Sequence, residues 1–418
     1  MGKIKKTVKK LVNLTPGIKE ASVCVYHKYS QLRYRKYAKK YPVDAHTVMF
    51  ESYMGRKYSC SPRSMFEAMC KDSRYRDYKK VWAFTDPEKH RYLEKYPNTI
   101  LVKYRSEDYY RYYACAGMWI TNYLLDYGIE KRPGQIYVQT WHGTPLKKIG
   151  CDVPRLELSK KERERTCREY QREGQMIDFM PSPSPFYTEK VKSAFCLGPQ
   201  ARVLEFGYPR NDDLFRYTEK KCENIKKELG IPADKKVILY APTWRQSQHT
   251  AGEGFTYSLG IDFDKMKTRL GDKAVILFRT HYFISNSFDF SKYGGFIKDV
   301  SSYDEINDLY LISDLLITDY SSVFFDYANL ERPILFYMYD YQAYREEMKD
   351  FYFGIELLPG PVIKEERDIS EDVDRLLEGF AVDDTYRRFN EIFNPHREVC
   401  GDRMVREIIR EYRGDYKR

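Results

Sequence analysis

Residues 309–337 place two serines where a buried strand is predicted to end. An apolar run stops at Asp319, and Ser321 and Ser322 follow at the start of a helical pattern. In an open α/β sheet, the turn after a parallel strand is where ligands bind. Hydroxyls and free N–H groups at a helix start can bind phosphate, although a serine there can also act only as an N-cap. The pattern therefore leaves two interpretations, a cap or one wall of a phosphate site, and we expect Asp319 to orient the turn.

Two more predicted strand ends in this half of the chain carry hydroxyl and cationic side chains. Thr243 and Arg245 follow one apolar run, and Arg279 and His281 follow the next. Because side chains alternate along an extended chain, Arg279 and His281 are expected to face the same side. A guanidinium fork and an imidazole beside two serines would suit a diphosphate. Each arginine alone could instead form a surface ion pair, but three such strand ends together favour a diphosphate site.

The first half of the chain offers one comparable group. His142 and Gly143 follow the predicted strand 136–140, and Lys147 stands four residues after Gly143. Histidine has an ordinary pKa near neutrality, so it can take a proton from an alcohol. Gly143 would allow close approach of the backbone. The alternative is a histidine that is simply hydrogen-bonded within a turn.

The elements that must position these residues alternate between strands and helices. Alternation of this kind predicts βαβ units and parallel sheets. The predicted strands are residues 47–50, 81–84, 99–102, 118–121, 136–140, 179–182, 236–240, 274–278, 296–298, 311–318 and 333–337. The predicted helices are residues 63–70, 107–116, 158–173, 185–195, 219–229, 263–270, 303–310, 371–377, 385–392 and 403–412.

The length of 418 residues exceeds what one core usually holds, and turn-forming residues at 206–212 mark a join. We expect an α/β protein of two doubly wound, Rossmann-like domains that face each other across a cleft. The expected first domain is residues 46–215 and the expected second domain is residues 216–395. A basic extension, residues 1–45, would precede them, and a C-terminal helix, residues 396–418, would follow.

Composition narrows the class of protein. The net charge of +10 suits an anionic partner such as nucleic acid, an acidic membrane surface or a phosphorylated substrate. No apolar run approaches the roughly 18 residues that span a bilayer, and no secretory signal is visible, so we expect a cytosolic protein. The nine cysteines include no CxxC pair, which favours isolated thiols over a zinc site or a disulfide framework.

The N-terminus is strongly basic. The first forty residues hold twelve Lys or Arg and one acid, Glu20. Ile4, Val8, Leu11 and Val12 have helical spacing among lysines, and we expect the helix to end at residues 16–17. Such a helix can lie on anionic lipid, or it can dock on its own domain.

Several common catalytic motifs are missing from the sequence. There is no GxxxxGK[ST] loop and no GxGxxG after a strand, which disfavours a P-loop nucleotidase and a dinucleotide-binding enzyme. There is no HExxH or HxE…CxxC metal pattern, and no GxSxG elbow of a serine hydrolase.

Taken together, four motifs resemble the CDP-glycerol glycerophosphotransferase family, whose members build teichoic-acid and related polyol-phosphate polymers in bacteria. The motifs are WHGTPLK at 141–147, APTWR at 241–245, RTH at 279–281 and ITDYSSVFFD at 317–326, and the resemblance covers about residues 45–395. It implies a GT-B-like fold, with the acceptor on the N-terminal domain and the CDP-linked donor on the C-terminal domain. It also implies peripheral attachment to the cytoplasmic side of the cell membrane, where the acceptor is lipid-linked.

The resemblance implies roles for individual residues. His142 is the expected base or transition-state contact on the acceptor side. His281, Arg279, Ser321 and Ser322 are the expected diphosphate ligands. The residues expected to border the bound substrates are Thr243, Arg245, Asp319, Lys147 and Gly143.

The implied reaction is attack of a hydroxyl on the β-phosphorus of CDP-glycerol or CDP-ribitol, with release of CMP. The acceptor would be a lipid-linked saccharide or polyol phosphate. Positioning and charge stabilisation carry most of phosphoryl transfer, so we expect no cofactor and no obligatory metal. We also expect an anionic membrane surface, and no nucleic acid, as a partner.

Two other functions use the same features. A GT-B glycosyltransferase would use a similar cleft for a nucleotide sugar, and a panel of donors separates the two enzymes. A non-catalytic basic protein would bind membrane or nucleic acid through its charge. The basic residues gather at the N-terminus while the motif residues stand at strand ends, which favours the enzyme.

Overall fold

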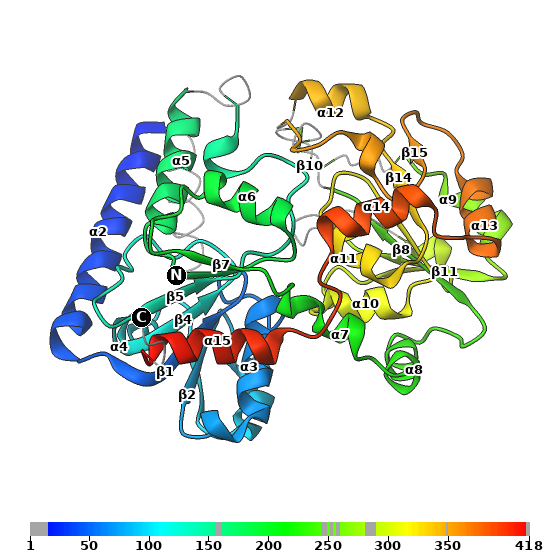
Figure 1. Ribbon diagram of the computed structural model, residues 1–418. Coiled ribbons are helices and arrows are strands. Elements are labelled where there is room, and N and C mark those ends of the chain that lie inside the picture. Colours follow the sequence, from blue (N-terminus) through cyan, green and yellow to red (C-terminus); the bar gives the residue numbers. More distant parts are fainter. Residues whose placement is uncertain are drawn as a thin grey trace.

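A computed structural model describes residues 16–154, 160–243, 249–250, 254–255, 260–280, 290–347 and 350–414. The chain forms two α/β domains, each built on a parallel sheet (Figure 1). The first domain carries a seven-stranded sheet of order β3-β2-β1-β4-β5-β6-β7, and the second carries a six-stranded sheet of order β12-β11-β8-β13-β14-β15. Both orders begin with the third, second, first and fourth strands of their sheet, as in doubly wound folds. The prediction of two such domains is confirmed.

In the first domain, every strand pair is parallel. Helical segments connect most successive strands, whereas residues 122–135 lead from β4 to β5 without a helix. The strands are β1 (Asp44–Glu51), β2 (Lys79–Phe84), β3 (Thr99–Lys103), β4 (Ala116–Thr121), β5 (Ile136–Gln139), β6 (Phe179–Pro181) and β7 (Arg202–Leu204). The helices are α2 (Pro16–Lys40), α3 (Cys60–Lys71), α4 (Glu107–Cys115), α5 (Lys160–Gly174) and α6 (Pro185–Ala194), with short 3₁₀ turns η1 (Ser73–Tyr75), η2 (Pro87–Lys95), η3 (Gly150–Asp152) and η4 (Pro209–Asn211).

The second domain repeats the pattern. Its strands are β8 (Lys236–Ala241), β11 (Ala274–Phe278), β12 (Ile297–Asp299), β13 (Leu315–Thr318), β14 (Ile334–Tyr337) and β15 (Val362–Ile363), with a separate pair β9 (His249–Thr250) and β10 (Gly254–Phe255). Its helices are α7 (Asp212–Phe215), α8 (Glu219–Glu228), α9 (Phe263–Leu270), α10 (Ile306–Ile312), α11 (Val323–Tyr327), α12 (Tyr341–Glu347), α13 (Ser370–Glu378) and α14 (Asp384–Phe393). The 3₁₀ turns are η6 (Ser291–Tyr293), η7 (Ala328–Leu330) and η8 (Ile355–Leu357).

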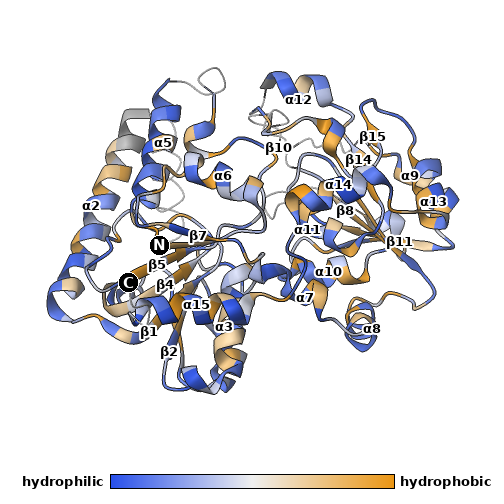
Figure 2. Cartoon of the chain, viewed as in Figure 1, coloured by the Kyte–Doolittle hydropathy of each residue, from blue (hydrophilic) through white to orange (hydrophobic). Residues whose placement is uncertain are grey.

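The central strands are mainly apolar, as the orange strands of both sheets show (Figure 2). Residues on β4, β11 and β13 are all buried. This continuous burial follows from the architecture, because helices cover both faces of a parallel sheet. The polar residues that follow such strands are therefore confined to the sheet edge, where the two domains meet.

The last helix, α15 (Gly401–Tyr412), returns to the first domain. It packs against α3, as the red and blue helices show side by side (Figure 1). Asp212 accepts hydrogen bonds from the N–H groups of Cys400 and Gly401 at 2.9 and 3.0 Å, which fixes the start of this return. The chain therefore passes between the two domains twice, once near Asp212 and once before α15. The predicted domain limits at residues 215 and 395 remain a prediction.

Several features differ from the sequence predictions: α12 and β15 were not predicted, and residues 311–312 end helix α10 instead of beginning a strand. Helix α2 begins at Pro16, where we had expected a helix to end, because proline fits the first turn of a helix. Residues 4–12 lie outside the described part. The three-residue strand β7 was also missed. Cys151 and Cys167 form a disulfide, although isolated thiols were expected, because spacing alone does not reveal which cysteines meet.

No helix in the described ranges is both long and apolar enough to cross a membrane. Helix α2 has 25 residues, and it carries many Lys, Arg and Tyr side chains. Its inner face packs on α4, where the Tyr34 ring is buried.

Candidate active site

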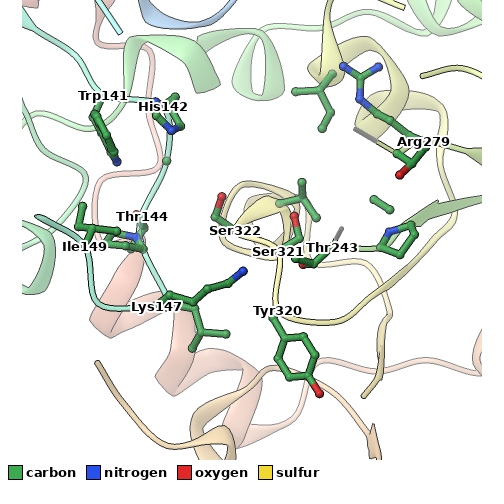
Figure 3. A pocket seen from close by; sticks show the side chains of 18 residues that line it. Trp141, His142, Thr144, Lys147, Ile149, Thr243, Arg279, Tyr320, Ser321 and Ser322 are labelled. Atoms are coloured by element: carbon green, nitrogen blue, oxygen red, sulfur yellow. The ribbon is translucent and has the colours of Figure 1, made fainter. Parts of the chain in front are cut away.

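A cavity of about 590 Å³ lies between the two domains (Figure 3). Trp141 to Lys147 and Ile149 form its wall on the first domain. The wall on the second domain comes from the ends of β8, β11 and β13. Seven of the predicted site residues line the cavity, namely His142, Gly143, Lys147, Thr243, Arg279, Ser321 and Ser322.

The ring of His142 is held in one orientation. Its Nδ1 lies 2.8 Å from the backbone carbonyl of Asn122, at the end of β4. A carbonyl accepts only, so Nδ1 carries the proton and Nε2 keeps its lone pair. The ring also stacks on Tyr123, with 5.8 Å between ring centroids. His142 therefore presents a fixed hydrogen-bond acceptor on the first domain.

Burial lowers the pKa of His142 to about 4. The Arg210 guanidinium acts in the same direction, and the Asn122 carbonyl opposes both. The imidazole is therefore neutral at pH 7, as a proton acceptor must be. It is a weaker base than free imidazole, so its contribution depends on position more than on basicity.

Arg210 connects the two walls of the cavity, and sequence reasoning missed it. Its Nη1 donates to the carbonyl of His142, and its Nη2 donates to Asp326 Oδ2 at 2.6 Å. Asn211 Nδ2 donates to the other oxygen of Asp326 at 3.0 Å. The ion pair is buried, with 8% and 2% side-chain exposure. The position of Arg210 in the turn-rich join was the one sequence signal, but nothing local indicated its partners.

Gly143 lets the domains approach closely. Its φ of +148° is rarely adopted by other residues, and an added Cβ would lie 3.1 Å from Ser322 Oγ. Ser322 precedes the five-residue helix α11, but its side chain makes no capping hydrogen bond. The interpretation of Ser322 as a side-chain cap is therefore wrong. Its hydroxyl faces the cavity beside the loop of His142 (Figure 3).

Asp319 supports the cavity wall from behind. Its carboxylate accepts hydrogen bonds from the N–H of Thr243, at 2.9 and 3.0 Å, and from the N–H of Tyr320 at 2.6 Å. The side chain is buried and does not line the cavity. It thus ties the turn after β13 to the turn after β8, as expected of a residue that orients the turn.

Lys147 extends across the cavity towards Ser321 and Ser322 (Figure 3). Its Nζ lies 5.3 Å from the centre of the Tyr344 ring, within cation–π range. Tyr344 stacks on Tyr320, with 3.6 Å between ring centroids. An aromatic pair from the second domain thus holds a first-domain ammonium group near the serines.

Backbone hydrogen bonds reinforce this junction. The N–H of Tyr352 donates to the carbonyl of Leu146, and the N–H of Lys148 donates to the carbonyl of Asp350, each at 2.8 Å. The Lys148 ammonium also pairs with the Asp350 carboxylate at 2.7 Å. The segment that carries Lys147 therefore has a defined position relative to the second domain.

Arg279 lines the cavity opposite His142, and part of its guanidinium is already engaged. Its Nη1 donates to the carbonyls of Val300 and Tyr303 at 3.0 and 2.8 Å. Among the described residues, Nε and Nη2 have no such partners, so they can bind an anion. Burial lowers the pKa of Arg279, but a guanidinium remains charged under ordinary conditions.

The predicted residues Arg245 and His281 lie outside the described residues. Within the described ranges, no group of three or more His, Cys, Asp or Glu side chains is placed to hold a metal ion. The cavity thus brings together a neutral imidazole, an ammonium, a guanidinium and two hydroxyls. Such a set can hold a phosphorylated ligand beside a proton acceptor.

Comparison with known proteins identifies the fold. A solved structure of the wall teichoic acid polymerase TagF, a histidine-to-asparagine variant soaked with CDPG, superposes with a TM-score of 0.83. The two chains are 34% identical, and the match covers 99% of this chain and 98% of that one. The fold is therefore GT-B-like, as the sequence resemblance implied.

Curated relatives act in teichoic acid synthesis. The teichoic acid poly(glycerol phosphate) polymerase of Staphylococcus epidermidis is 38% identical over 372 residues, which cover 87% of this chain and 51% of that protein. That of Bacillus spizizenii is 35% identical and covers 88% of this chain and 93% of that protein. The chain spans about half the length of the Staphylococcus epidermidis and Bacillus subtilis polymerases that it matches.

A family model described as CDP-glycerol:poly(glycerophosphate) glycerophosphotransferase matches residues 33–410, which is most of the chain. Its range includes both domains and every cavity residue described above. This chain therefore belongs to the CDP-glycerol:poly(glycerophosphate) glycerophosphotransferase family.

Proposed function

We propose that the protein transfers polyol phosphate, with glycerol phosphate as the first choice, from a CDP-activated donor to a hydroxyl of a lipid-linked, teichoic-acid-type acceptor. CMP is the second product. The observation that carries the proposal is the interdomain cavity, in which His142 and Lys147 of the first domain face Arg279, Ser321 and Ser322 of the second. Similarity to a teichoic acid poly(glycerol phosphate) polymerase and to a teichoic acid glycerol-phosphate transferase supports the choice of glycerol.

The second-domain wall would hold the donor diphosphate. Ser321 and Ser322 offer hydroxyl donors. Arg279 offers Nε and Nη2, since only its Nη1 donates to the carbonyls of Val300 and Tyr303. Helix α11 is only five residues long, so side chains carry more of this binding than a helix dipole does. Lys147 adds a positive charge from the opposite wall. We assign His281, Thr243 and Arg245 to the same donor site.

The first-domain wall would hold the acceptor. Nε2 of His142 takes the proton of the acceptor hydroxyl, whose oxygen attacks the β-phosphorus of the donor. The bond between that phosphorus and the bridging oxygen breaks, and CMP leaves with the bond's electron pair. The new phosphodiester keeps the polyol, and the proton passes from the imidazole to solvent. Lys147 and Arg279 offset the charge that gathers on the phosphoryl oxygens.

The test incubates the purified protein with a lipid-linked acceptor and a panel of donors. CDP-glycerol, CDP-ribitol, UDP-glucose and GDP-mannose are compared, and released nucleotide and product mass are measured. The expected result is CMP release with a product one or more glycerol phosphates heavier. His142→Ala and His281→Ala should abolish CMP release while the protein stays folded. Release of UDP or GDP would instead assign a glycosyltransferase.

We also propose that the protein binds peripherally to the cytoplasmic face of an anionic membrane. Helix α2 lies at the outer edge of the first domain (Figure 1). Val25, Leu32 and Tyr29 fall at helical spacing and are 67%, 67% and 56% exposed. Lys28 and Lys36 have the same spacing on the helix. Apolar side chains among lysines suit a lipid interface.

Co-sedimentation with vesicles tests the membrane proposal. Binding to phosphatidylglycerol vesicles should exceed binding to phosphatidylcholine vesicles and should weaken with salt. Val25→Glu combined with Leu32→Glu should reduce it, while the distant exposed pair Tyr217→Ser and Val399→Ser should not. Equal binding to both vesicle types would contradict the proposal. Salt-sensitive binding to RNA with no donor turnover would point to nucleic acid.

A further inference from the structure

Lys57 extends from the first domain to a backbone carbonyl in the second. It stands in the loop between β1 and α3, and its Nζ donates to the carbonyl of Tyr303 at 3.1 Å. That same carbonyl accepts from Nη1 of Arg279 at 2.8 Å. Two cations from different domains therefore share one acceptor next to the cavity that we assign to the donor.

Arg63 also ties the turn that receives both cations to the first domain. Arg63 Nη1 bonds Glu305 at 3.0 Å, and its Nε bonds Glu67 at 2.9 Å. Glu305 is thus already paired. Of the residues that the structure describes, none places a carboxylate within ion-pair distance of the Lys57 ammonium. Lys57 is accordingly not one half of a simple salt bridge.

The surroundings of Lys57 are electrostatically unfavourable for a cation. Burial, followed by the charge of Arg279, lowers the pKa of Lys57 to about 8. Asp304 and Glu305, from the turn before α10, act in the opposite direction but do not compensate. Two partly desolvated cations on one carbonyl repel each other, and a bound anion nearby would relieve that repulsion.

We propose that Lys57 is a positioning residue for the donor. Its charged ammonium fixes the 300–303 turn against the first domain. The turn in turn holds Arg279, so that the remaining guanidinium nitrogens of Arg279 are available to the diphosphate. This inference rests on the proposed function and deepens it, since it names a first-domain residue that acts on the donor site. It also links domain contact to donor binding, because the same carbonyl serves both cations.

The test compares Lys57→Met and Lys57→Arg with the wild type. Lys57→Met should raise the KM for CDP-glycerol about tenfold or more, since a hydrogen bond from a charged group is typically worth at least that factor, and should change kcat much less. Lys57→Arg should recover most of the loss. The matched control is Lys71→Met, at the exposed end of α3, which should behave as the wild type.

The pH profile provides a readout that a purely structural role would not change. The wild-type KM should rise as pH increases from 7 to 9, because the Lys57 ammonium loses its proton near pH 8. Lys57→Arg should stay flat over this range, and Lys57→Met should be high throughout. The other charged groups that act on Lys57 are Arg279, Asp304 and Glu305. Lys57→Arg keeps all three, so a flat profile in this variant would exclude them as the source of the change.

The outcomes separate the inference from the function on which it rests. An unchanged donor KM in Lys57→Met, or equal loss and equal pH dependence in both variants, would overturn the role of Lys57. If the wild type releases no CMP from either CDP-polyol, the proposed function fails. Calorimetric titration with CDP then still decides the inference, since equal affinity of wild type and Lys57→Met for CDP would reject it.

Discussion

Arg210 and Asp326 form a buried ion pair across the two domains, with 2.6 Å between Nη2 and Oδ2. The same guanidinium donates to the carbonyl of His142. One side chain thus ties the helix after the serine turn to the loop of the candidate base. The distance between the two walls of the cavity therefore depends on this pair.

Removing the Arg210 side chain should destabilise the folded protein. Arg210→Met leaves the Asp326 carboxylate buried without its partner, so we expect a loss of about 3–5 kcal/mol in the free energy of unfolding, measured by urea denaturation. Arg216→Met is the control, because the Arg216–Asp213 pair is partly exposed and should contribute less than about 1 kcal/mol. The double variant Arg210→Met with Asp326→Leu should lose less free energy of unfolding than Arg210→Met alone, because no buried carboxylate is left without a partner. Equal losses for Arg210→Met and Arg216→Met would contradict the assigned role.

The lowered pKa of His142 has a defined effect on stability. The folded protein holds this histidine neutral down to about pH 4, whereas its ordinary pKa is 6.5. Between these values the unfolded chain binds a proton that the folded chain does not, so the contribution to stability is lost as pH falls. The stability difference between wild type and His142→Gln should therefore become less favourable to the wild type from pH 7 to pH 4.5. Urea unfolding at several pH values measures it, and a pH-independent difference would disprove the shift.

Gly143 should not tolerate a side chain. In Gly143→Ala, the new Cβ would press on Ser322 Oγ, and the backbone would keep a φ of +148°. We expect a destabilisation on the order of 1–3 kcal/mol and a loss of CMP release greater than the loss of fold. Gly379→Ala is the matched control, since nothing lies within 4 Å of its added Cβ. Thermal melting and turnover assays on both variants decide the matter.

Donor affinity should depend on the hydroxyls and the ammonium at the cavity. Removing both hydroxyls in the variant Ser321→Ala with Ser322→Ala should raise the donor KM by about tenfold or more, because each can donate to a charged phosphate. Lys147→Met should do the same, while Lys192→Met, on an exposed part of α6, should not. A donor KM within twofold of wild type in both cavity variants would remove these residues from the donor site.

Chelation tests the predicted independence from metal. Cationic side chains at the cavity can neutralise the donor diphosphate without a divalent ion, so CMP release should be unchanged in excess EDTA. The control is the same assay after addition of Mg²⁺ beyond the chelator. Loss of activity in EDTA, with recovery in Mg²⁺, would show that a metal ion is required.

Local patterns of apolar residues were sufficient to predict the architecture of two parallel sheets. The continuous apolar run 274–278 is a buried strand as predicted. Of the predicted strand 311–318, only residues 315–318 form a strand, because Leu311 and Ile312 end helix α10. The alternation of such runs with helices indicates two parallel sheets. Parallel strands end at one edge, so the polar residues after them had to gather there. For this reason Arg279 and Ser322 are predicted to lie at one sheet edge, and the expectation of two domains that face each other across a cleft places His142 opposite them.

The sequence by itself thus determined the fold class and most strand ends, because those depend on periodicity within a few residues. It also indicated seven of the cavity residues, through their place after predicted strands and through the motifs that resemble the family. Only the tertiary structure decided which side chains meet across the domains. Arg210 and Asp326 are 116 residues apart, and Lys57 and Tyr303 are 246 apart. A local pattern carries no information on such pairs, since burial of charge and shared acceptors arise only when the two sheets face each other.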